Sequence, residues 1–296
     1  MGIANIISNI NRHPFNNNPL PAYTRFLQWQ IKSRLFNKDF IYNWVSNTRF
    51  VVRRGDTGLT ANIYNGLAEF HDMAFVLHAL RANDRFLDIG ANAGSYSILA
   101  GAAAGADVLC VEPLPETYAK LLKQIDINNM QDHVKALNIG VSDKPATLQF
   151  TADLDCGNHV IAKNESHADT TEVQVDTIDN ICTDFSPYMI KMDTEGYENF
   201  VIDGATKTLE NDETNCLVIE LYTGKSIYNT SAQDIHKKIV SFGFKPFRYN
   251  AHKKELTALE NKLNTEDQNT IYLKNPDDIR ARIATAKKYT LFGKDI

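Results

Sequence analysis

The chain has 296 residues, of which 43% are apolar, so it can bury one large hydrophobic core. Its 31 lysine and arginine residues against 36 acidic residues give a net charge of −5, which excludes an overall basic field that would attract nucleic acid. The N-terminus shows neither a basic region nor a long apolar run, so we expect a cytoplasmic protein without a signal peptide or a transmembrane segment.

Residues 1–50 differ in composition from the rest of the chain. Six basic residues are opposed only by Asp39, and aromatic residues lie between them. The run AYTRFLQWQIKSRLF (22–36) has the periodicity of a helix, so we predict an N-terminal helical accessory segment. The pattern leaves its role open: packing on the main domain, covering an active site, forming a homo-oligomer, or docking to a partner or an anionic membrane surface.

Residues 51–275 alternate short apolar runs with helix-length segments. RFVVRR is typical of a strand and GLAEFHDMAFVLHALR of a helix. Five further strand candidates follow, namely RFLDIG, DVLCVEP, VKALNIGV, YMIKMD and CLVIELY. Most of them precede a helical stretch such as PETYAKLLKQIDIN. This alternation predicts an α/β fold with a doubly wound, mostly parallel sheet and helices on both faces.

Two stretches depart from this pattern. Between residues 145 and 178, the alternating runs ATLQF and TEVQVDTI flank a polar stretch, which predicts a β-hairpin-like insertion over one edge of the sheet. Near the end, FGFKPFRYN and QNTIYLKNP are predicted to pair in antiparallel fashion and to supply the antiparallel final strand. Residues 276–296 are predicted to form a helical C-terminal tail.

The four cysteines do not form a CxxC pair or a zinc-type cluster. They are Cys110, Cys156, Cys182 and Cys216. Two of them lie within apolar, strand-like runs. We therefore expect reduced and mostly buried thiols.

The stretch FLDIGANAGSYSILA (86–100) contains the end of the first of the five strands and the turn after it. A doubly wound sheet binds its ligands at such strand ends. Gly90 permits a sharp turn, and Gly94 permits close approach of the next helix and a ligand. The G-x-G-x-x-G pattern of dinucleotide sites is missing, and Asp88 would repel a pyrophosphate. A cationic ligand without phosphate, S-adenosylmethionine, suits this turn. The other candidate donor-binding residues of the turn are Asn92, Ser95 and Tyr96.

Acidic residues follow two more strands. Glu112 comes 22 residues after Gly90, beside Pro113, and is placed to accept both hydroxyls of a ribose. In GVSD (140–143), Ser142 and Asp143 are candidates to bind the adenine edge. Upstream of the first strand, Glu69 is a candidate to close over the methionine end. The three strand ends then present methionine, ribose and adenine subsites in chain order.

These motifs, together with VQVDTIDNI and above all YMIKMDTEGYENFVIDGA, resemble the FkbM family of S-adenosylmethionine-dependent methyltransferases from about residue 85 to residue 220. The most specific part is IKMDTEGYE followed by IDGA, with Met192 and Thr194 as conservative departures. The resemblance implies a class I methyltransferase sheet and O-methylation of a small molecule, often a sugar hydroxyl. Residues 1–50 lie outside it.

The segment IKMDTEGYE is expected to face the methyl donor and to serve the acceptor. A hydroxyl must lose its proton to attack the methyl carbon, so a base must lie within reach. Asp193 is the first candidate and Glu195 the second, while Lys191 would pair with a carboxylate or stabilise alkoxide charge. His159 and His71 are further base candidates. Both glutamates also have a structural interpretation: Glu195 as an acid that binds backbone amides at the helix start, and Glu198 as an acid in the first turn of the helix.

Glu220 ends the strand CLVIELY and points toward the same region. With Asp193 and Glu195 it could bind Mg²⁺ through oxygen ligands, but no diagnostic spacing supports a metal, so magnesium is not expected. Two alternative functions stay open: a nucleic-acid methyltransferase and a non-catalytic binding protein. The acidic charge and the absence of an Asn/Asp-Pro-Pro-aromatic motif argue against the first.

Overall fold

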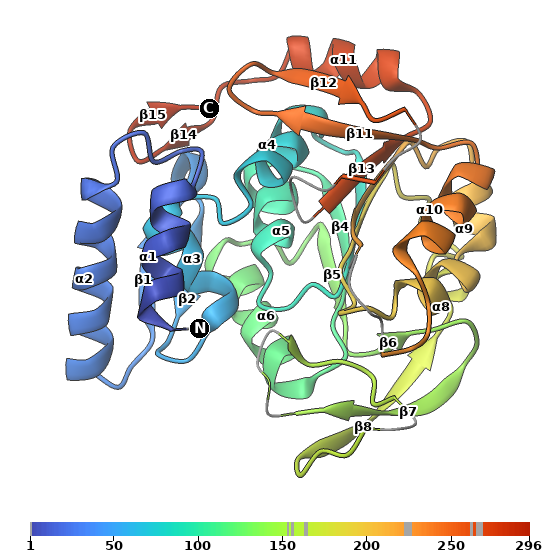
Figure 1. The fold of residues 1–296 in the computed structure, drawn as a ribbon, viewed down its shortest axis with the longest axis horizontal. Helices are drawn as coiled ribbons and strands as arrows, with labels where there is room; N and C mark the ends of the chain where they lie inside the picture. Colours follow the sequence, from blue (N-terminus) through green and yellow to red (C-terminus); the bar gives the residue numbers. More distant parts are fainter. Residues whose placement is uncertain are drawn as a thin grey trace.

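The computed structural model describes residues 2–152, 154, 157–162, 165–221, 227–260, 263–264 and 269–296, without the side chain of residue 57. Eight strands of this part form the central sheet, β3 (Arg85–Ile89), β4 (Asp107–Val111), β5 (Val134–Leu137), β9 (Met189–Met192), β10 (Cys216–Glu220), β11 (Lys245–Asn250), β12 (Glu255–Ala258) and β13 (Asn269–Leu273). Their order across the sheet is β12-β11-β13-β10-β9-β3-β4-β5 (Figure 1).

The sheet is parallel on one side and antiparallel on the other. Strands β10, β9, β3, β4 and β5 run parallel, and Asp88 on β3 stands opposite Lys191 on β9. Strand β13 is antiparallel to β10 and to β11, which confirms the predicted antiparallel pair. Strand β12 adds a further antiparallel strand that the sequence analysis did not predict. The predicted α/β architecture is confirmed.

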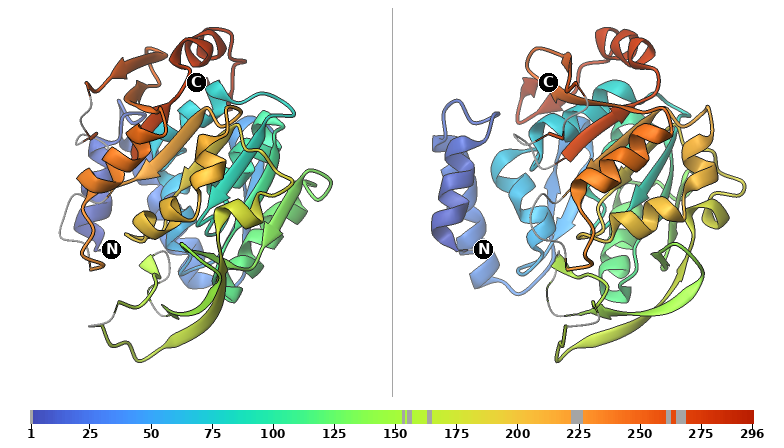
Figure 2. Two further views of the ribbon diagram at one scale, coloured as in Figure 1. Left: turned by 90° about the vertical axis from the view of Figure 1, so that its right-hand side faces the viewer. Right: turned by 45° about the vertical axis from the view of Figure 1, so that its right-hand side comes forward.

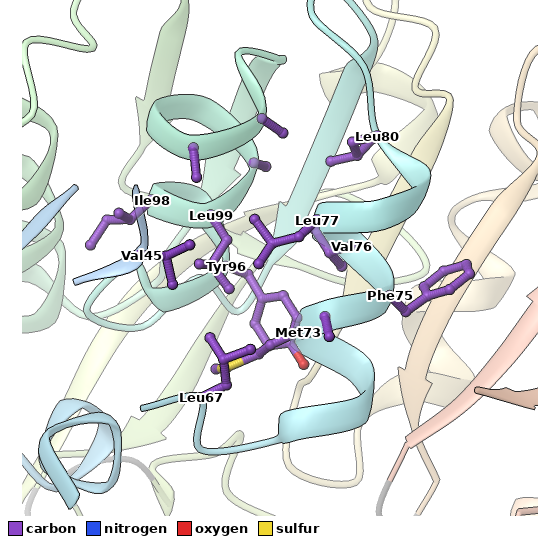
Figure 3. Packing of buried hydrophobic residues seen from close by; sticks show 14 of the residues in the cluster. Val45, Leu67, Met73, Phe75, Val76, Leu77, Leu80, Tyr96, Ile98 and Leu99 are labelled. Carbon is purple, nitrogen blue, oxygen red and sulfur yellow. The ribbon is translucent and has the colours of Figure 1, made fainter. Parts of the chain in front are cut away.

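Helices cover both faces of the sheet, each over its own hydrophobic cluster. One cluster includes Phe86 and packs under α4 (Phe70–Ala79), α5 (Ser95–Ser97), η2 (Ile98–Ala104), α6 (Pro115–Ile127) and α11 (Pro276–Ala284). The other includes the next residue of β3, Leu87, and packs under α7 (Ile178–Ile181), α8 (Glu198–Asp203), α9 (Thr206–Glu210) and α10 (Ala232–Ser241). Successive residues of a strand face opposite sides, so β3 contributes to both cores. Figure 3 shows Tyr96 beside Met73 and Leu67 in the first cluster.

The N-terminal segment contains strands as well as helices, which corrects the helical prediction for residues 1–50. Its elements are α1 (Ile3–Arg12), α2 (Leu20–Leu35), β1 (Phe40–Asn43), η1 (Val45–Asn47), β2 (Arg49–Val52) and then α3 (Thr57–Asn65). The β1–β2 hairpin crosses the predicted boundary at residue 50. Figure 2 shows the two helices against one flank of the molecule. Ile10, Phe26 and Trp29 belong to the first core cluster, so the segment packs on the main domain.

The insertion forms the predicted hairpin. Strands β7 (Ala146–Thr151) and β8 (Thr170–Asp176) pair in antiparallel fashion, and β6 (Gly140–Val141) joins β8 in parallel, making a separate small sheet. The run VKALNIGV was predicted as one strand but divides into β5 and β6, in different sheets. The reason is Asn138, whose side-chain amide donates to the carbonyls of Glu112 and Pro113, both at 2.9 Å, and so turns the chain.

The C-terminal tail is helical only at its start. After α11, strands β14 (Thr290–Leu291) and β15 (Lys294–Asp295) form a small hairpin, which corrects the prediction of a helix over 276–296. Its two-residue turn, Phe292 and Gly293, has φ of +49° and +76°, the positive values of a type I′ turn. Leu291 is fully buried, so the hairpin anchors the chain end to the core.

Three of the four cysteines, Cys110, Cys182 and Cys216, are buried free thiols, as predicted. Cys156 lies outside the described residues. Across the described ranges, none of the helices combines the length and the hydrophobicity that crossing a bilayer requires.

Candidate active site

A cavity of about 380 Å³ opens at the carboxyl ends of β3, β4, β9 and β10, with the insertion as a further wall. Thirteen predicted site residues line it, although they come from segments far apart in the chain. They are Glu69, Asp88, Gly90, Asn92, Ser95, Tyr96, Glu112, Pro113, His159, Lys191, Asp193, Glu195 and Glu220.

The turn after β3 depends on Gly90. Its φ is +70°, and a Cβ atom there would lie 1.9 Å from the carbonyl oxygen of Asp193. The amides of Gly90 and Ala91 both donate to the carbonyl of Val111 at 3.0 Å, which fixes the turn to the end of β4. The glycine therefore allows three strand ends to meet at one point.

Asp88 is buried below this turn, on the cavity wall. Its carboxylate accepts a hydrogen bond of 2.5 Å from Ser97 Oγ, and Lys191 stands opposite it on β9. Burial raises the pKa of Asp88 to about 6, against the lowering effects of the Ser97 hydroxyl and the Lys191 charge. Its negative charge is therefore costly unless a cation lies close by.

Glu112 holds the glycine-containing turn at the end of β4. One carboxylate oxygen accepts from the Asn92 amide at 2.9 Å, and the other accepts from the Leu114 amide at 3.0 Å. Burial outweighs these two hydrogen bonds and raises the pKa of Glu112 to about 7. Each oxygen keeps a second lone pair that can accept from a ligand hydroxyl in the cavity.

Tyr96 connects the turn to the start of α4. Its hydroxyl donates to Glu69 at 2.5 Å, and the Asn269 amide donates to the same carboxylate oxygen at 2.9 Å. The Tyr96 hydroxyl points toward the first turn of α4 in Figure 3. Glu69 thus has a fixed position on the cavity wall.

Lys191 is the cationic side chain among the described residues that line the cavity. It is 1% exposed, its Nζ lies 3.4 Å from Asp193 Oδ2, and it lies 5.2 Å from the centre of the Tyr96 ring. The neighbouring carboxylates, Asp193 first, outweigh burial and raise the pKa of Lys191. The ammonium stays charged inside the site.

Glu195 and Glu198 have different roles in the turn after β9. Glu198 is buried in the first turn of α8, as its structural interpretation predicts. One of its oxygens accepts from the Thr194 amide, the Thr194 hydroxyl and the Gly196 amide at 3.0 to 3.1 Å, so Glu198 takes the amide-binding role that was considered for Glu195. Glu195 has a φ of +53°, an unfavourable conformation for its side chain. Glu195 is exposed, but desolvation by the neighbouring protein atoms, followed by the charge of Asp193, raises the pKa of Glu195 to about 7.

The described lining carries an excess of acid. Six carboxyl groups face the cavity, from Glu69, Asp88, Glu112, Asp193, Glu195 and Glu220, against the single ammonium of Lys191. Burial, followed by the charge of Asp193, also raises the pKa of Glu220. Such a lining attracts a cationic ligand and disfavours an anionic one.

Four residues singled out in the sequence do not line this cavity. Gly94 instead admits α6, because a Cβ there would lie 2.7 Å from Leu121. The Ser142 hydroxyl bonds to Asp143 and to the Tyr197 hydroxyl. The backbone carbonyl of Ser142 packs against Gly204, where an added Cβ atom would lie 2.1 Å from the carbonyl oxygen. His71 accepts from the amide of Ala251 through Nδ1 at 3.1 Å, outside the cavity.

The sequence analysis missed an apolar part of the lining. It consists of Leu114, Ile139, Val141 and Phe150. Leu114 directly precedes α6, and the other three lie in or beside β6 and β7, so their only signal was hydrophobicity, which core positions share. They form a surface suited to a flat aromatic ring at the place where Ser142 and Asp143 were expected to bind one.

Comparisons with known proteins identify the family of the chain. A family model described as the methyltransferase FkbM domain matches residues 88–246, more than half of the chain. The hexuronic acid methyltransferase AglP of Haloferax volcanii is 27% identical over 157 residues, which span 50% of this chain and 60% of that protein. This chain therefore matches less than two thirds of its relative's length.

Two solved structures resemble the chain at low sequence identity. An rRNA methylase from Streptococcus thermophilus is 10% identical with a TM-score of 0.41, covering 68% of this chain and 91% of that chain. Precorrin 8w decarboxylase of Methanobacterium thermoautotrophicum is 11% identical with a TM-score of 0.41, covering 69% of this chain and 89% of that chain.

Proposed function

Because the chain belongs to the FkbM methyltransferase domain family, we propose that it transfers a methyl group from S-adenosylmethionine to a hydroxyl of a sugar or sugar-bearing acceptor. The observation that carries the proposal is the cavity at the strand ends, where six carboxyl groups surround one buried ammonium. When bound, S-adenosylmethionine supplies an electrophilic methyl group on a positively charged sulfur. The lining fits this donor, which is cationic and has no phosphate.

On the donor side, each wall of the cavity has a distinct chemistry. Asp88 and Glu69 supply negative charge beside the Gly90 turn, for the cationic methionine end. Glu112 offers two carboxylate oxygens for the ribose hydroxyls. The apolar residues Ile139, Val141 and Phe150 would hold the adenine, in place of the predicted Ser142 and Asp143.

On the acceptor side, the chain must hold a hydroxyl and remove its proton. We assign the proton to Glu195, because a pKa of about 7 suits a general base near neutral pH. Asp193 is engaged with Lys191 at 3.4 Å, so this pair would orient the hydroxyl and balance alkoxide charge. The acceptor oxygen gains the methyl group, the S–CH3 bond breaks, and its electron pair stays on sulfur.

The carboxylates of Asp193, Glu195 and Glu220 are a poor match for Mg²⁺. Among the described residues, these three do not bring ligand atoms within 4.8 Å of one another. The Lys191 ammonium also lies against Asp193, where a divalent ion would be repelled. We therefore derive no step that uses magnesium at this place.

The acceptor class has two supports. The relative AglP is named for methylation of a hexuronic acid, which favours a sugar acceptor. The acidic lining of this chain, however, favours a neutral sugar hydroxyl over a uronate carboxylate. Both supports are satisfied by an uncharged sugar that is linked to a nucleotide or a lipid, if the sugar enters the cavity and the charged carrier stays outside it.

Two measurements test the proposal. Calorimetry with S-adenosylhomocysteine should show binding to one site per chain, and no binding at high micromolar concentration would refute the donor assignment. A methyl-transfer screen across neutral nucleotide sugars, lipid-linked glycans, uronates and RNA should then give turnover with neutral sugars. Turnover on RNA alone would favour the nucleic-acid alternative and refute the sugar assignment.

A further inference from the structure

Three potential metal ligands converge in the insertion, next to the cavity. His159 Nε2 lies 3.2 Å from Glu165 Oε1, and His167 Nε2 lies 3.4 Å from the same oxygen. Their ligand atoms lie within 4.8 Å of one another, and all three side chains are only partly buried. The cluster is made of other residues than Asp193, Glu195 and Glu220, the acids considered for a metal from the sequence, although His159 lines the same cavity as they do.

The hydrogen bonds of His159 determine which ring nitrogen is free. Its Nδ1 lies 2.9 Å from the carbonyl oxygen of Gly157, and a carbonyl only accepts, so Nδ1 must carry the proton. In a neutral ring, Nε2 then presents a lone pair to the Glu165 carboxylate, which is also an acceptor. This contact at 3.2 Å is favourable when either a proton on Nε2, which makes the ring an imidazolium, or a metal ion lies between the two atoms. Metal titration distinguishes these two cases.

The two distances from Glu165 match a shared metal ion, and the two histidine nitrogens lie within 4.8 Å of each other. Two ligands that bind one tetrahedral ion at about 2.0–2.1 Å lie about 3.3–3.4 Å from each other. The separations of 3.2 and 3.4 Å in the cluster are close to this value.

The surrounding hydrogen bonds are those of a built metal site. Imidazole ligands of metals usually donate their second nitrogen to a carbonyl, as His159 does to Gly157. Carboxylate ligands are usually held by a donor on the other oxygen, and Glu165 Oε2 accepts from the Ala162 amide at 2.9 Å.

We propose that His159, Glu165 and His167 bind one divalent transition-metal ion of the zinc class, through two imidazole Nε2 atoms and one carboxylate oxygen. Nitrogen ligands select such ions over Mg²⁺ and Ca²⁺, which prefer oxygen. Three protein ligands leave a fourth position open for water or a ligand group. Because His159 also lines the cavity, the ion would fix this wall beside Glu195.

The test uses the full chain after dialysis against a chelator. Titration with Co²⁺ should give the visible absorption of a four-coordinate ion, saturating at one equivalent, and Zn²⁺ should displace it. Glu165→Gln and His167→Ala should each weaken Zn²⁺ binding at least about tenfold. His133→Ala is the matched control, because His133 bonds to the carbonyl of Gly101 far from the cluster, and it should bind as the wild type does.

A second measurement separates metal binding from misfolding. Saturating Zn²⁺ should raise the Tm of the wild type and of His133→Ala, but not that of Glu165→Gln or His167→Ala, while the metal-free forms melt alike. Absence of saturable Co²⁺ binding, or equal Zn²⁺ affinity in all variants, would overturn the site. The inference stands apart from the proposed function, because S-adenosylhomocysteine binding is measured on the metal-free protein.

Discussion

Glu112 holds the backbone of the turn and, in the proposed function, also binds the ribose. The variant Glu112→Gln keeps the size of the side chain but replaces one acceptor oxygen with a donor. The amide replaces an acceptor with an NH2 group that faces the backbone N–H of Asn92 or Leu114. One donor of the turn then lacks its partner, and one ribose hydroxyl lacks its acceptor. We expect the Kd of S-adenosylhomocysteine, measured by calorimetry, to rise by roughly 10- to 100-fold.

Glu116→Gln is the matched control for this variant. Glu116 lies four residues further along, is exposed in the first turn of α6 and does not line the cavity. Its substitution should leave the Kd within about twofold of the wild type. A Kd in Glu112→Gln as low as that of the control would remove Glu112 from the donor site.

Glu195→Gln tests the general base. Glutamine keeps the size of the side chain but cannot take the proton, so we expect kcat to fall by roughly 10²- to 10⁴-fold with the best acceptor from the screen. In the wild type, kcat should fall as the pH drops below the Glu195 pKa of about 7, because the base is then protonated. The variant should lose this acidic limb.

Donor binding provides the control for Glu195→Gln. Its S-adenosylhomocysteine affinity should match that of the wild type, which shows that the cavity is intact. A variant that keeps the acidic limb and half or more of the wild-type kcat would show that another group removes the proton.

The variant Gly90→Ala tests whether the turn after β3 requires a glycine. The added methyl group would lie 1.9 Å from the Asp193 carbonyl oxygen, at a φ of +70°. Gly55 has a φ of +105°, and no atom lies within 4 Å of the position that an added methyl group would take, so Gly55→Ala reports the backbone conformation alone. We expect urea unfolding to show a loss of about 1–3 kcal/mol for Gly55→Ala and a larger loss for Gly90→Ala. Equal losses would mean that the strand ends separate easily.

Acids at strand ends could be predicted from the sequence because a parallel sheet brings its carboxyl ends together, wherever they lie along the chain. Asp88, Glu112 and Asp193 reached one cavity for that reason. Side-chain direction within loops could not be predicted in this way. Ser142 faces Tyr197 rather than the cavity, because its carbonyl packs against Gly204.

At the scale of elements, helix α2 carries apolar side chains on a buried face and on an exposed face. Substitutions on these two faces should change the free energy of unfolding by different amounts. Trp29 is 3% exposed and packs in the first core cluster, whereas Leu27 on the same helix is 58% exposed. We expect Trp29→Ala to lower the free energy of unfolding by about 3–5 kcal/mol and Leu27→Ala to change it by less than about 0.5 kcal/mol. Urea unfolding measures both. A small effect of Trp29→Ala would show that residues 1–50 form a separable accessory segment.

Two of the elements that were not predicted from the sequence, β1 and the C-terminal hairpin, share one physical cause. Strand β1 has alternating burial, but Ile41 on its outer side is 60% exposed and apolar, so the sequence shows no alternation of polarity. The C-terminal hairpin has only two residues on each strand, too few for a periodic pattern. Tertiary packing decides the structure of both, whereas the long strands and helices of the central domain have clear patterns of their own.

At the scale of the whole molecule, the buried carboxyl groups make folding depend on pH. The pKa of Asp88 is raised to about 6 and that of Glu112 to about 7, from ordinary values of 3.8 and 4.5. Above pH 4.5 the folded state therefore binds more protons than the unfolded state. By linkage, their contribution is largest at low pH and is lost as the pH rises through these values.

Two histidines, the partly buried His13 and the fully buried His78, act in the opposite direction, but in a lower range of pH. Burial lowers the pKa of His13 and of His78 to about 4, so the unfolded state binds more protons below the ordinary value of 6.5. Their effect decreases stability as the pH falls from 6.5 toward 4. In the unfolded state the histidines are still half protonated at pH 6.5, so their effect ends only about one pH unit higher, and the more numerous carboxyl groups dominate the change toward pH 8.

We therefore expect the free energy of unfolding, from urea titrations at constant ionic strength, to be higher at pH 6.5 than at pH 8 by about 1 kcal/mol or more. Glu112 and Glu195, whose folded-state pKa of about 7 lies between the two conditions, contribute together with Glu220, whose pKa is also raised. Glu112→Gln should reduce the difference, and Glu116→Gln should preserve it. Equal or greater stability at pH 8 in the wild type would mean that these carboxyl groups are already ionised at pH 6.5.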